Sequence, residues 1–188
     1  MQALCARWAG LPAAEARCVR RQQGQDHSSG DLHAGIPHMS SLPKTAAADF
    51  VGAWRLVSFE SRDGEGRVHR PLGEDVVGQL LYDAHGNMSA ILMRPDRPRF
   101  ASGDLQRGTD AEVRAAFDGF LAYFGTYTVD AAKATVAHHV RAAAYPNWVG
   151  GDQVRHYRFE GPRLVLSTPA LQVGGRPLTS TLVWERLL

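Results

Sequence analysis

The feature that most constrains the fold is a long succession of short segments rich in β-forming residues, separated by turn residues. These segments recur from Phe50 onward, and about eight or nine can be counted, including a short one at residues 67–70. Clusters of Gly, Pro, Asn and Asp separate them, as at residues 83–86, 145–151 and 174–177. This spacing is typical of an all-β fold, either an antiparallel up-and-down barrel or a sandwich. The mostly short connections favour the barrel.

One segment departs from the strand pattern and predicts a single amphipathic helix over residues 109–124. Its apolar residues recur at spacings of three and four, the spacing of one helix face; they are Val113, Ala116, Phe117, Phe120, Leu121 and Phe124. Thr109 followed by Glu112 forms a capping box at the start, and Gly125 is a suitable stop. Because no second helix is predicted, we expect this helix to cover a barrel end as a plug or flap.

Residues 1–48 differ from the remainder and predict a disordered N-terminal tail before one barrel domain over residues 49–188. Within this tail, residues 22–35 are polar and show neither a helix period nor a strand period. Both cysteines, Cys5 and Cys18, lie in the tail, so no disulfide framework is expected in the barrel. The first residues lack the uninterrupted apolar core of a secretory signal, and we therefore expect a cytoplasmic protein.

The charge of the barrel domain is balanced. Residues 1–45 hold five of the 21 Lys and Arg residues and three of the 19 Asp and Glu residues, which leaves 16 of each sign in the remainder. A nucleic-acid binder normally presents a basic face to the phosphates, so we predict no nucleic-acid partner. No apolar run approaches the roughly 20 residues that a membrane-spanning helix needs, so we predict no membrane span.

A hairpin over residues 134–161 carries the most concentrated set of site-forming side chains. It holds three of the eight histidines together with two tyrosines and a tryptophan. If its loop is centred near residues 147–148, His138 lies opposite Tyr157, and Arg155 follows on the same face. This register predicts that these three side chains form a polar cluster on an otherwise apolar inner face.

The adjacent pair His138 and His139 suggests a metal site, but strand geometry opposes it. Successive side chains point to opposite faces, so the pair cannot bind one ion, and His138 with His156 fails likewise in the proposed register. We therefore predict no metal, while haem ligation by a single histidine stays open. The sequence has no Gly-x-Ser-x-Gly motif and no Gly-rich loop between a strand and a helix, so we predict no cofactor.

The predicted cluster of His138, Tyr157 and Arg155 is compatible with three roles. The side chains can satisfy one another, because buried polar groups need hydrogen-bond partners whether or not they act on a ligand. They can instead orient a ligand, or serve as acid, base and anion stabiliser in a reaction. Trp148 can cap the barrel mouth or only anchor its loop. The further candidates to line the lumen are Tyr82, Tyr127 and Met88.

Two motifs connect the chain to a known family. Gly52-Ala53-Trp54 is a Gly-x-Trp at the start of the first strand, as in lipocalins, and Arg186 stands near the end of the last strand. The run from residue 50 to 188 resembles the bacterial and fungal lipocalin-like domain proteins, notably in GAWRLVSFE, GQLLYDAHGNMSA, AYFGTYTVD, YPNWVGGDQVRHYRF and LVWER. The resemblance implies a calycin-type β-barrel in which the arginine packs across the tryptophan and closes the bottom. It implies a small-molecule cavity more firmly than any reaction.

The leading functional prediction is binding of a small apolar or amphipathic molecule inside the barrel, oriented by His138, Tyr157 and Arg155. One alternative is a cofactor-independent isomerase or cyclase of secondary metabolism that uses the same three residues. A second alternative is a structural or stress protein without a ligand. The sequence leaves the oligomeric state open.

Overall fold

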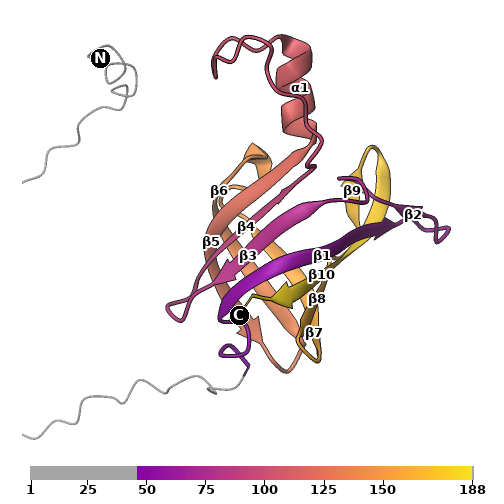
Figure 1. Ribbon diagram of the computed structural model, residues 1–188. Coiled ribbons are helices and arrows are strands. Elements are labelled where there is room, and N and C mark those ends of the chain that lie inside the picture. The colour runs from indigo at the N-terminus through magenta and orange to yellow at the C-terminus, as the bar shows by residue number, and fades with distance from the viewer. Residues whose placement is uncertain (1–45, 188) are drawn as a thin grey trace, which may run out of the picture. The chain divides into compact units, whose positions relative to one another are not determined.

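The computed structural model describes residues 46–187, which form a β-barrel with one α-helix (Figure 1). Residues 1–45, nearly all of the predicted tail, lie outside the described residues. The barrel strands are β1 (Gly52–Arg62), β3 (Val77–Tyr82), β4 (Asn87–Met93), β5 (Phe120–Asp130), β6 (Thr135–Ala143), β7 (Asp152–Glu160), β8 (Arg163–Ser167) and β10 (Arg176–Arg186). Two short strands, β2 (Val68–His69) and β9 (Leu171–Val173), pair with β1 and β10.

The strands follow one another around the barrel nearly in chain order. Each barrel strand pairs antiparallel with the next, and β10 pairs with β1 to close the sheet. Alternate side chains along each strand point into the lumen, and these inward positions supply the apolar core. The predicted all-β class and the up-and-down barrel are confirmed.

The bottom of the barrel is closed by an aromatic and cationic stack. The Trp54 indole is buried and donates a hydrogen bond of 2.8 Å to the Phe50 carbonyl. The Arg186 guanidinium lies 4.2 Å from the centre of the Trp54 ring and donates to the Val51 carbonyl. Gly52 has a φ of +139°, and a Cβ atom there would lie 2.7 Å from Arg186 Nη1. The expected packing of Arg186 across Trp54 is confirmed.

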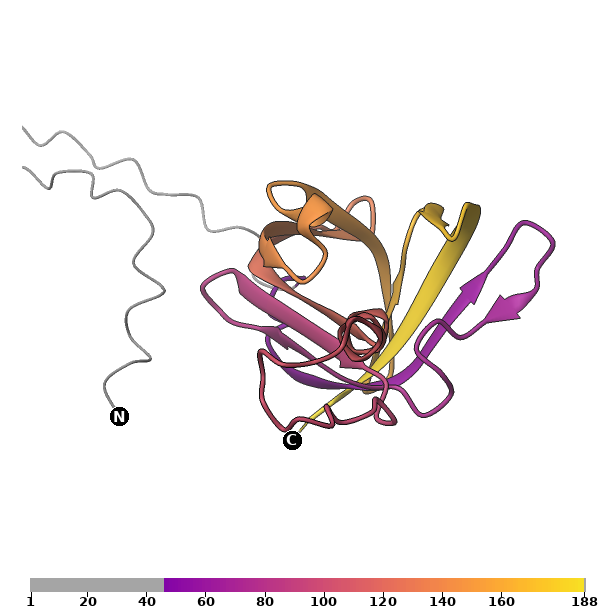
Figure 2. The same cartoon turned by 90° about the horizontal axis from the view of Figure 1, so that it is seen from above.

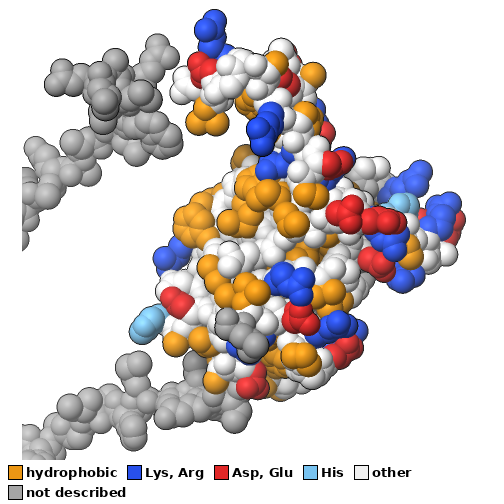
Figure 3. Space-filling model, in the orientation of Figure 1, with side chains coloured by type: hydrophobic (Ala, Val, Ile, Leu, Met, Phe, Trp, Pro, Cys, Tyr) orange, Lys and Arg blue, Asp and Glu red, His pale blue; other side chains and the backbone are white. Residues whose placement is uncertain are grey.

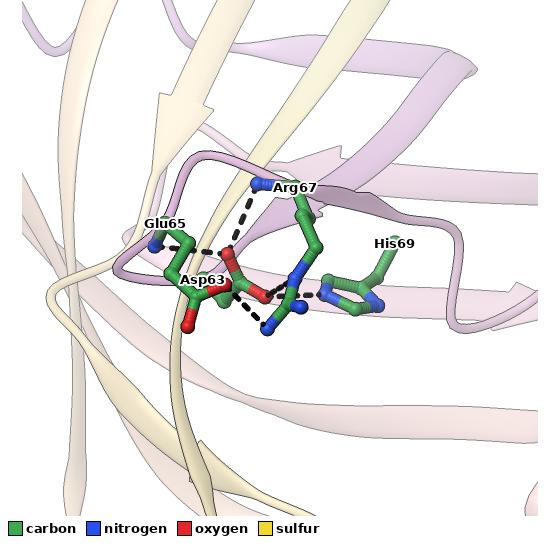
Figure 4. A network of polar contacts seen from close by, with 4 residues as sticks. All are labelled: Asp63, Glu65, Arg67 and His69. Atoms are coloured by element: carbon green, nitrogen blue, oxygen red, sulfur yellow. Dashed lines mark hydrogen bonds and ion pairs between the residues drawn. The ribbon is translucent and has the colours of Figure 1, made fainter.

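A carboxylate organises the turn between β1 and β2 (Figure 4). Asp63 accepts hydrogen bonds from the backbone amides of Glu65 and Arg67, each at 3.0 Å, and from Arg67 Nε at 2.9 Å. His69 Nε2 lies 3.1 Å from the same carboxylate. The hydrogen bonds from Arg67 and then His69 hold the pKa of Asp63 well below its usual range.

The helix is shorter than the predicted 109–124. It forms α1 (Asp110–Asp118), with Gly119 as its C-cap, and β5 begins at Phe120. The apolar residues after the helix suit either period, and the strand prevails because β5 pairs along its length with β4 and β6. The predicted helix is therefore wrong over residues 119–124.

The start of α1 follows the prediction, whereas its packing does not. The capping box between Thr109 and Glu112 is confirmed. None of its residues is buried, and Val113 and Phe117 are 52% and 45% exposed. The helix stands at the upper end of β5 in Figure 1 and is seen end-on from above in Figure 2. Because none of its residues is buried, the helix does not fill the barrel end as a plug, and a role as a flap stays a prediction.

The predicted register of the 134–161 hairpin is also wrong. His138 pairs with Gln153, whereas the backbone amide of Tyr157 donates to the Ala134 carbonyl. The connection is asymmetric, because β6 continues along β5 beyond the last residue that it pairs with β7. The turn η1 (Pro146–Trp148) therefore does not mark the centre of the hairpin. His138 and Tyr157 are not cross-strand neighbours.

The outer surface combines ion pairs with exposed apolar side chains. Arg70 bonds to Glu60 at 3.0 Å beside the β1–β2 turn. Leu81, Ile91 and Phe124 are exposed on β3, β4 and β5, where apolar side chains gather in Figure 3. Within residues 46–187, no helix is long and apolar enough to cross a membrane.

Candidate ligand-binding site

A cavity of about 120 Å³ lies inside the barrel. Most of its wall is apolar, and six strands each contribute one leucine: Leu80, Leu92, Leu121, Leu166, Leu171 and Leu182. Polar side chains on the wall are few: Tyr123, His138, Arg155, Thr168 and Ser180. An apolar chamber with a few placed polar groups is the usual form of a small-molecule site.

Three buried side chains on three strands form a hydrogen-bonded chain. His138 of β6 is 1% exposed, and its Nε2 lies 2.7 Å from the Tyr82 hydroxyl of β3. Its Nδ1 lies 2.9 Å from the Tyr123 hydroxyl of β5. Tyr123 and His138 line the cavity, whereas Tyr82 lies behind His138. Both ring nitrogens are thus occupied by tyrosine hydroxyls.

Burial keeps the His138 ring neutral. Desolvation lowers the pKa of His138 to about 3, and the positive charge of Arg155 contributes to the shift. Burial also raises the pKa of both Tyr82 and Tyr123, while Arg155 offsets part of that rise. At neutral pH the chain therefore consists of a neutral imidazole between two protonated phenols.

A neutral imidazole carries one N–H, which orients the chain of hydrogen bonds. If Nε2 carried it, the proton of the Tyr82 hydroxyl would have no partner in the described structure, where His138 is the one hydrogen-bond partner of that hydroxyl. Protonation at Nδ1 leaves the hydroxyl proton of Tyr123 instead, and because Tyr123 lines the cavity, water or a ligand can accept it there, which avoids the cost of about 1–3 kcal/mol for a buried unpaired donor. Tyr82 then donates to Nε2 and Nδ1 donates to Tyr123. The Tyr123 hydroxyl proton remains free on the cavity side.

Arg155 supplies the positive charge of the cavity wall. It lies on β7 opposite Val136 and is 7% exposed. Its Nη1 donates to the Val154 carbonyl at 2.9 Å and its Nη2 to Gln153 Oε1 at 3.3 Å. No carboxylate in the described part of the chain forms a salt bridge with it. The guanidinium is therefore a nearly buried charge whose partners are all neutral.

A second hollow adjoins the cavity at the end of the barrel that carries α1. This outer hollow of about 280 Å³ is lined by Phe117 of α1 and by Tyr145 and Trp148 of the β6–β7 loop. Trp148 also lines the inner cavity and packs edge-on against Tyr123, with ring centres 5.5 Å apart. Phe59 is a second side chain common to both hollows. The inner cavity and the outer hollow therefore adjoin at this end of the barrel.

The structure brings together some of the sequence-predicted site residues and separates others. His138, Arg155 and Trp148 line the cavity, and Tyr82 contacts it only through His138. The other three lie outside the cavity wall: Tyr157, Tyr127 and Met88. Tyr157 packs on Phe50 with ring centres 4.8 Å apart, and the Tyr127 hydroxyl donates to the Asp83 carbonyl. Met88 is a core residue.

Sequence reasoning missed Tyr123 and Trp184. Tyr123 falls within the predicted helix over residues 109–124, whereas the alternation of β5 points it inward together with Leu121. Trp184 lines the cavity, and its buried Nε1 has no hydrogen-bond partner in the described structure. The alternating pattern of the last strand was the available signal for Trp184.

His138 and His139 face opposite sides of β6, as predicted. His139 lies on the outside, where Nδ1 is 2.7 Å from Asp152 and Nε2 is 3.0 Å from Thr128. Across residues 46–187, no three His, Cys, Asp or Glu side chains cluster as metal ligands would. The described residues thus offer no metal-binding group of the usual composition.

Comparison with known proteins agrees with the barrel and its cavity. The sequence pattern of the lipocalin-like domain matches residues 51–187. A 4'-hydroxy-3'-methoxypropiophenone carrier protein from Aspergillus oryzae is 37% identical over 107 residues, which cover 53% of this chain and 96% of the relative. The chain belongs to the lipocalin-like domain family.

Proposed function

We propose that the protein is a carrier that holds a small, largely apolar molecule with one aromatic ring in its barrel and releases it unchanged. The observation that carries this proposal is the apolar cavity of about 120 Å³. An apolar protein cavity of about 150 Å³ accommodates benzene, so this space is slightly smaller than a one-ring cavity, and the adjoining hollow of about 280 Å³ adds room for a ring and its substituents. The aromatic side chains at the mouth, Tyr123 and Trp148, provide an apolar surface on which the aromatic ring of a ligand can pack.

The state of His138 favours a carrier over an isomerase or cyclase. A general base works best when its pKa lies near the working pH, whereas burial lowers the pKa of His138 to about 3. Both of its nitrogens already bond to tyrosines. The imidazole is therefore a fixed structural hub rather than a proton acceptor, which leaves ligand orientation to Tyr123 and Arg155.

The relative from Aspergillus oryzae indicates the class of cargo. Its name gives the cargo as 4'-hydroxy-3'-methoxypropiophenone, which has one aromatic ring with a ketone and oxygen substituents. Such a molecule combines an apolar ring with hydrogen-bond acceptors, the combination that the cavity wall complements. We propose an aryl ketone or a related phenol as the cargo of this chain.

The test is calorimetric titration with 4'-hydroxy-3'-methoxypropiophenone of the wild type and two variants. Ala90→Leu extends a side chain into the cavity, whereas Ala137→Leu makes the same change on the outer face of β6. We expect Ala90→Leu to weaken binding at least about tenfold and Ala137→Leu to leave it unchanged. The compound should be recovered unaltered after incubation. Absence of binding by the wild type, equal binding by Ala90→Leu, or conversion of the compound would contradict the proposal.

A further inference from the structure

We infer that the cavity selects ligands that carry an ionised oxygen, a carboxylate or a phenolate, and that Arg155 pairs with it. This inference rests on the proposed function and narrows its ligand class. Among the described residues that line the inner cavity, Arg155 is the only Lys or Arg, and none is an Asp or Glu.

The first support is the incomplete pairing of Arg155. The side chain is 7% exposed, and its hydrogen-bond acceptors, the Val154 carbonyl, Gln153 Oε1 and the Tyr123 hydroxyl, are all neutral. A guanidinium carries five N–H donors, so these contacts leave donors free. A buried charge is normally paired, because removing it from water is costly. An anionic oxygen in the cavity would supply the counter-charge that the described residues lack.

The second support is that the other polar groups of the wall also offer donors. The Nε1–H of Trp184 is buried and has no acceptor in residues 46–187. The Tyr123 hydroxyl proton is free on the cavity side when His138 is protonated at Nδ1. These two donors and Arg155 lie on three different strands around one chamber.

Acceptors on the wall are already engaged. Thr168 Oγ1 accepts from the backbone amide of Ser180 at 3.0 Å, and the Ser180 hydroxyl bonds to that of Ser61 at 2.7 Å. No carboxylate or carboxamide side chain from residues 46–187 lines the cavity. A ligand whose polar group is a donor would leave Arg155 and Trp184 unpaired. A binding site rejects a ligand strongly when that ligand leaves the buried polar groups of the site without hydrogen-bond partners.

The inference is tested with two matched probes, 4-nitrophenol and 4-nitroanisole. They share ring size and nitro group, but only 4-nitrophenol can ionise, and its phenolate is yellow. We expect the wild type to bind 4-nitrophenolate at least about tenfold more tightly than 4-nitroanisole. We also expect bound 4-nitrophenol to ionise at a lower pH than the free compound, because Arg155 favours the anion.

The variant Arg155→Met removes the charge while keeping an apolar side chain of similar length. Arg158→Met is the matched control, because Arg158 lies on the same strand and is exposed beside Glu160. Arg155→Met should bind the two probes equally well, and Arg158→Met should behave as the wild type. If Arg155→Met does not fold, the two-probe comparison on the wild type decides alone.

The outcomes separate this inference from the proposed carrier function. Equal affinity of the wild type for the two probes would overturn the inference and leave an apolar carrier in place. A preference for 4-nitrophenolate that survives in folded Arg155→Met would also overturn it. Failure of both probes to bind would overturn the inference, and the carrier function would then be decided by the titration with 4'-hydroxy-3'-methoxypropiophenone.

Discussion

Desolvation decides the character of the site at the scale of single residues. His138 is enclosed by apolar strands and two tyrosine rings, so its charged form is disfavoured, and Arg155 adds repulsion. The ring keeps its place through the bonds to Tyr82 and Tyr123. A histidine that would titrate near neutral pH in water thus becomes a neutral connector.

This neutral state predicts how stability depends on pH. The pKa of His138 is about 3 in the fold against 6.5 in the unfolded chain, so the unfolded state takes up the proton first as pH falls. The free energy of unfolding should be highest above pH 6.5 and should decline as pH falls from there toward 3, by up to about 1.4 kcal/mol per unit. Urea unfolding at several pH values measures this decline.

The control for the pH dependence is His138→Leu, which removes the imidazole and keeps an apolar side chain. The variant will be less stable at every pH, because Tyr82 and Tyr123 lose their shared partner. As pH falls from 6.5, and before the carboxylates titrate, the free energy of unfolding of the variant should decline less steeply than that of the wild type. Identical declines in the two proteins would contradict a buried neutral histidine.

At the scale of elements, the contact between the first and last barrel strands holds the bottom closed. Arg186→Met removes the cation over Trp54 and the hydrogen bond to the Val51 carbonyl. We expect a loss of about 1–3 kcal/mol in the free energy of unfolding, measured by urea titration. Arg55→Met is the control, because this β1 side chain forms an exposed pair with Glu185 and its loss should cost under about 1 kcal/mol. Equal effects of the two variants would contradict the closing role of Arg186.

Element types could be predicted from the sequence more fully than element boundaries. The strand segments, their up-and-down order and the capping box at Thr109 all follow from local patterns. The end of α1 does not, because Phe120 and Leu121 satisfy both a helix period and a strand period until β4 and β6 are known. The register of the 134–161 hairpin is mispredicted for a related reason. How far β6 continues along β5 is set by packing between strands and not by the local sequence.

At the scale of the whole molecule, the barrel brings distant residues together around one chamber. Tyr82 and His138 are 56 positions apart, and Tyr123 comes from a third strand. Sequence reasoning could place His138 and Arg155 on inner faces by alternation. It could not predict their tyrosine partners or the cavity, because the space left inside depends on side-chain volumes from every strand.

Binding of the cargo inside the barrel can be observed directly by methyl NMR of the leucines during titration with 4'-hydroxy-3'-methoxypropiophenone. Leu92 and Leu166 are buried on the cavity wall, whereas Leu81 is exposed on the outer face of β3. We predict that the methyl signals of Leu92 and Leu166 shift and show contacts to the ligand ring, while those of Leu81 stay unchanged. Shifts confined to Leu81 and the outer surface, or no shifts at saturating ligand, would contradict binding inside the barrel.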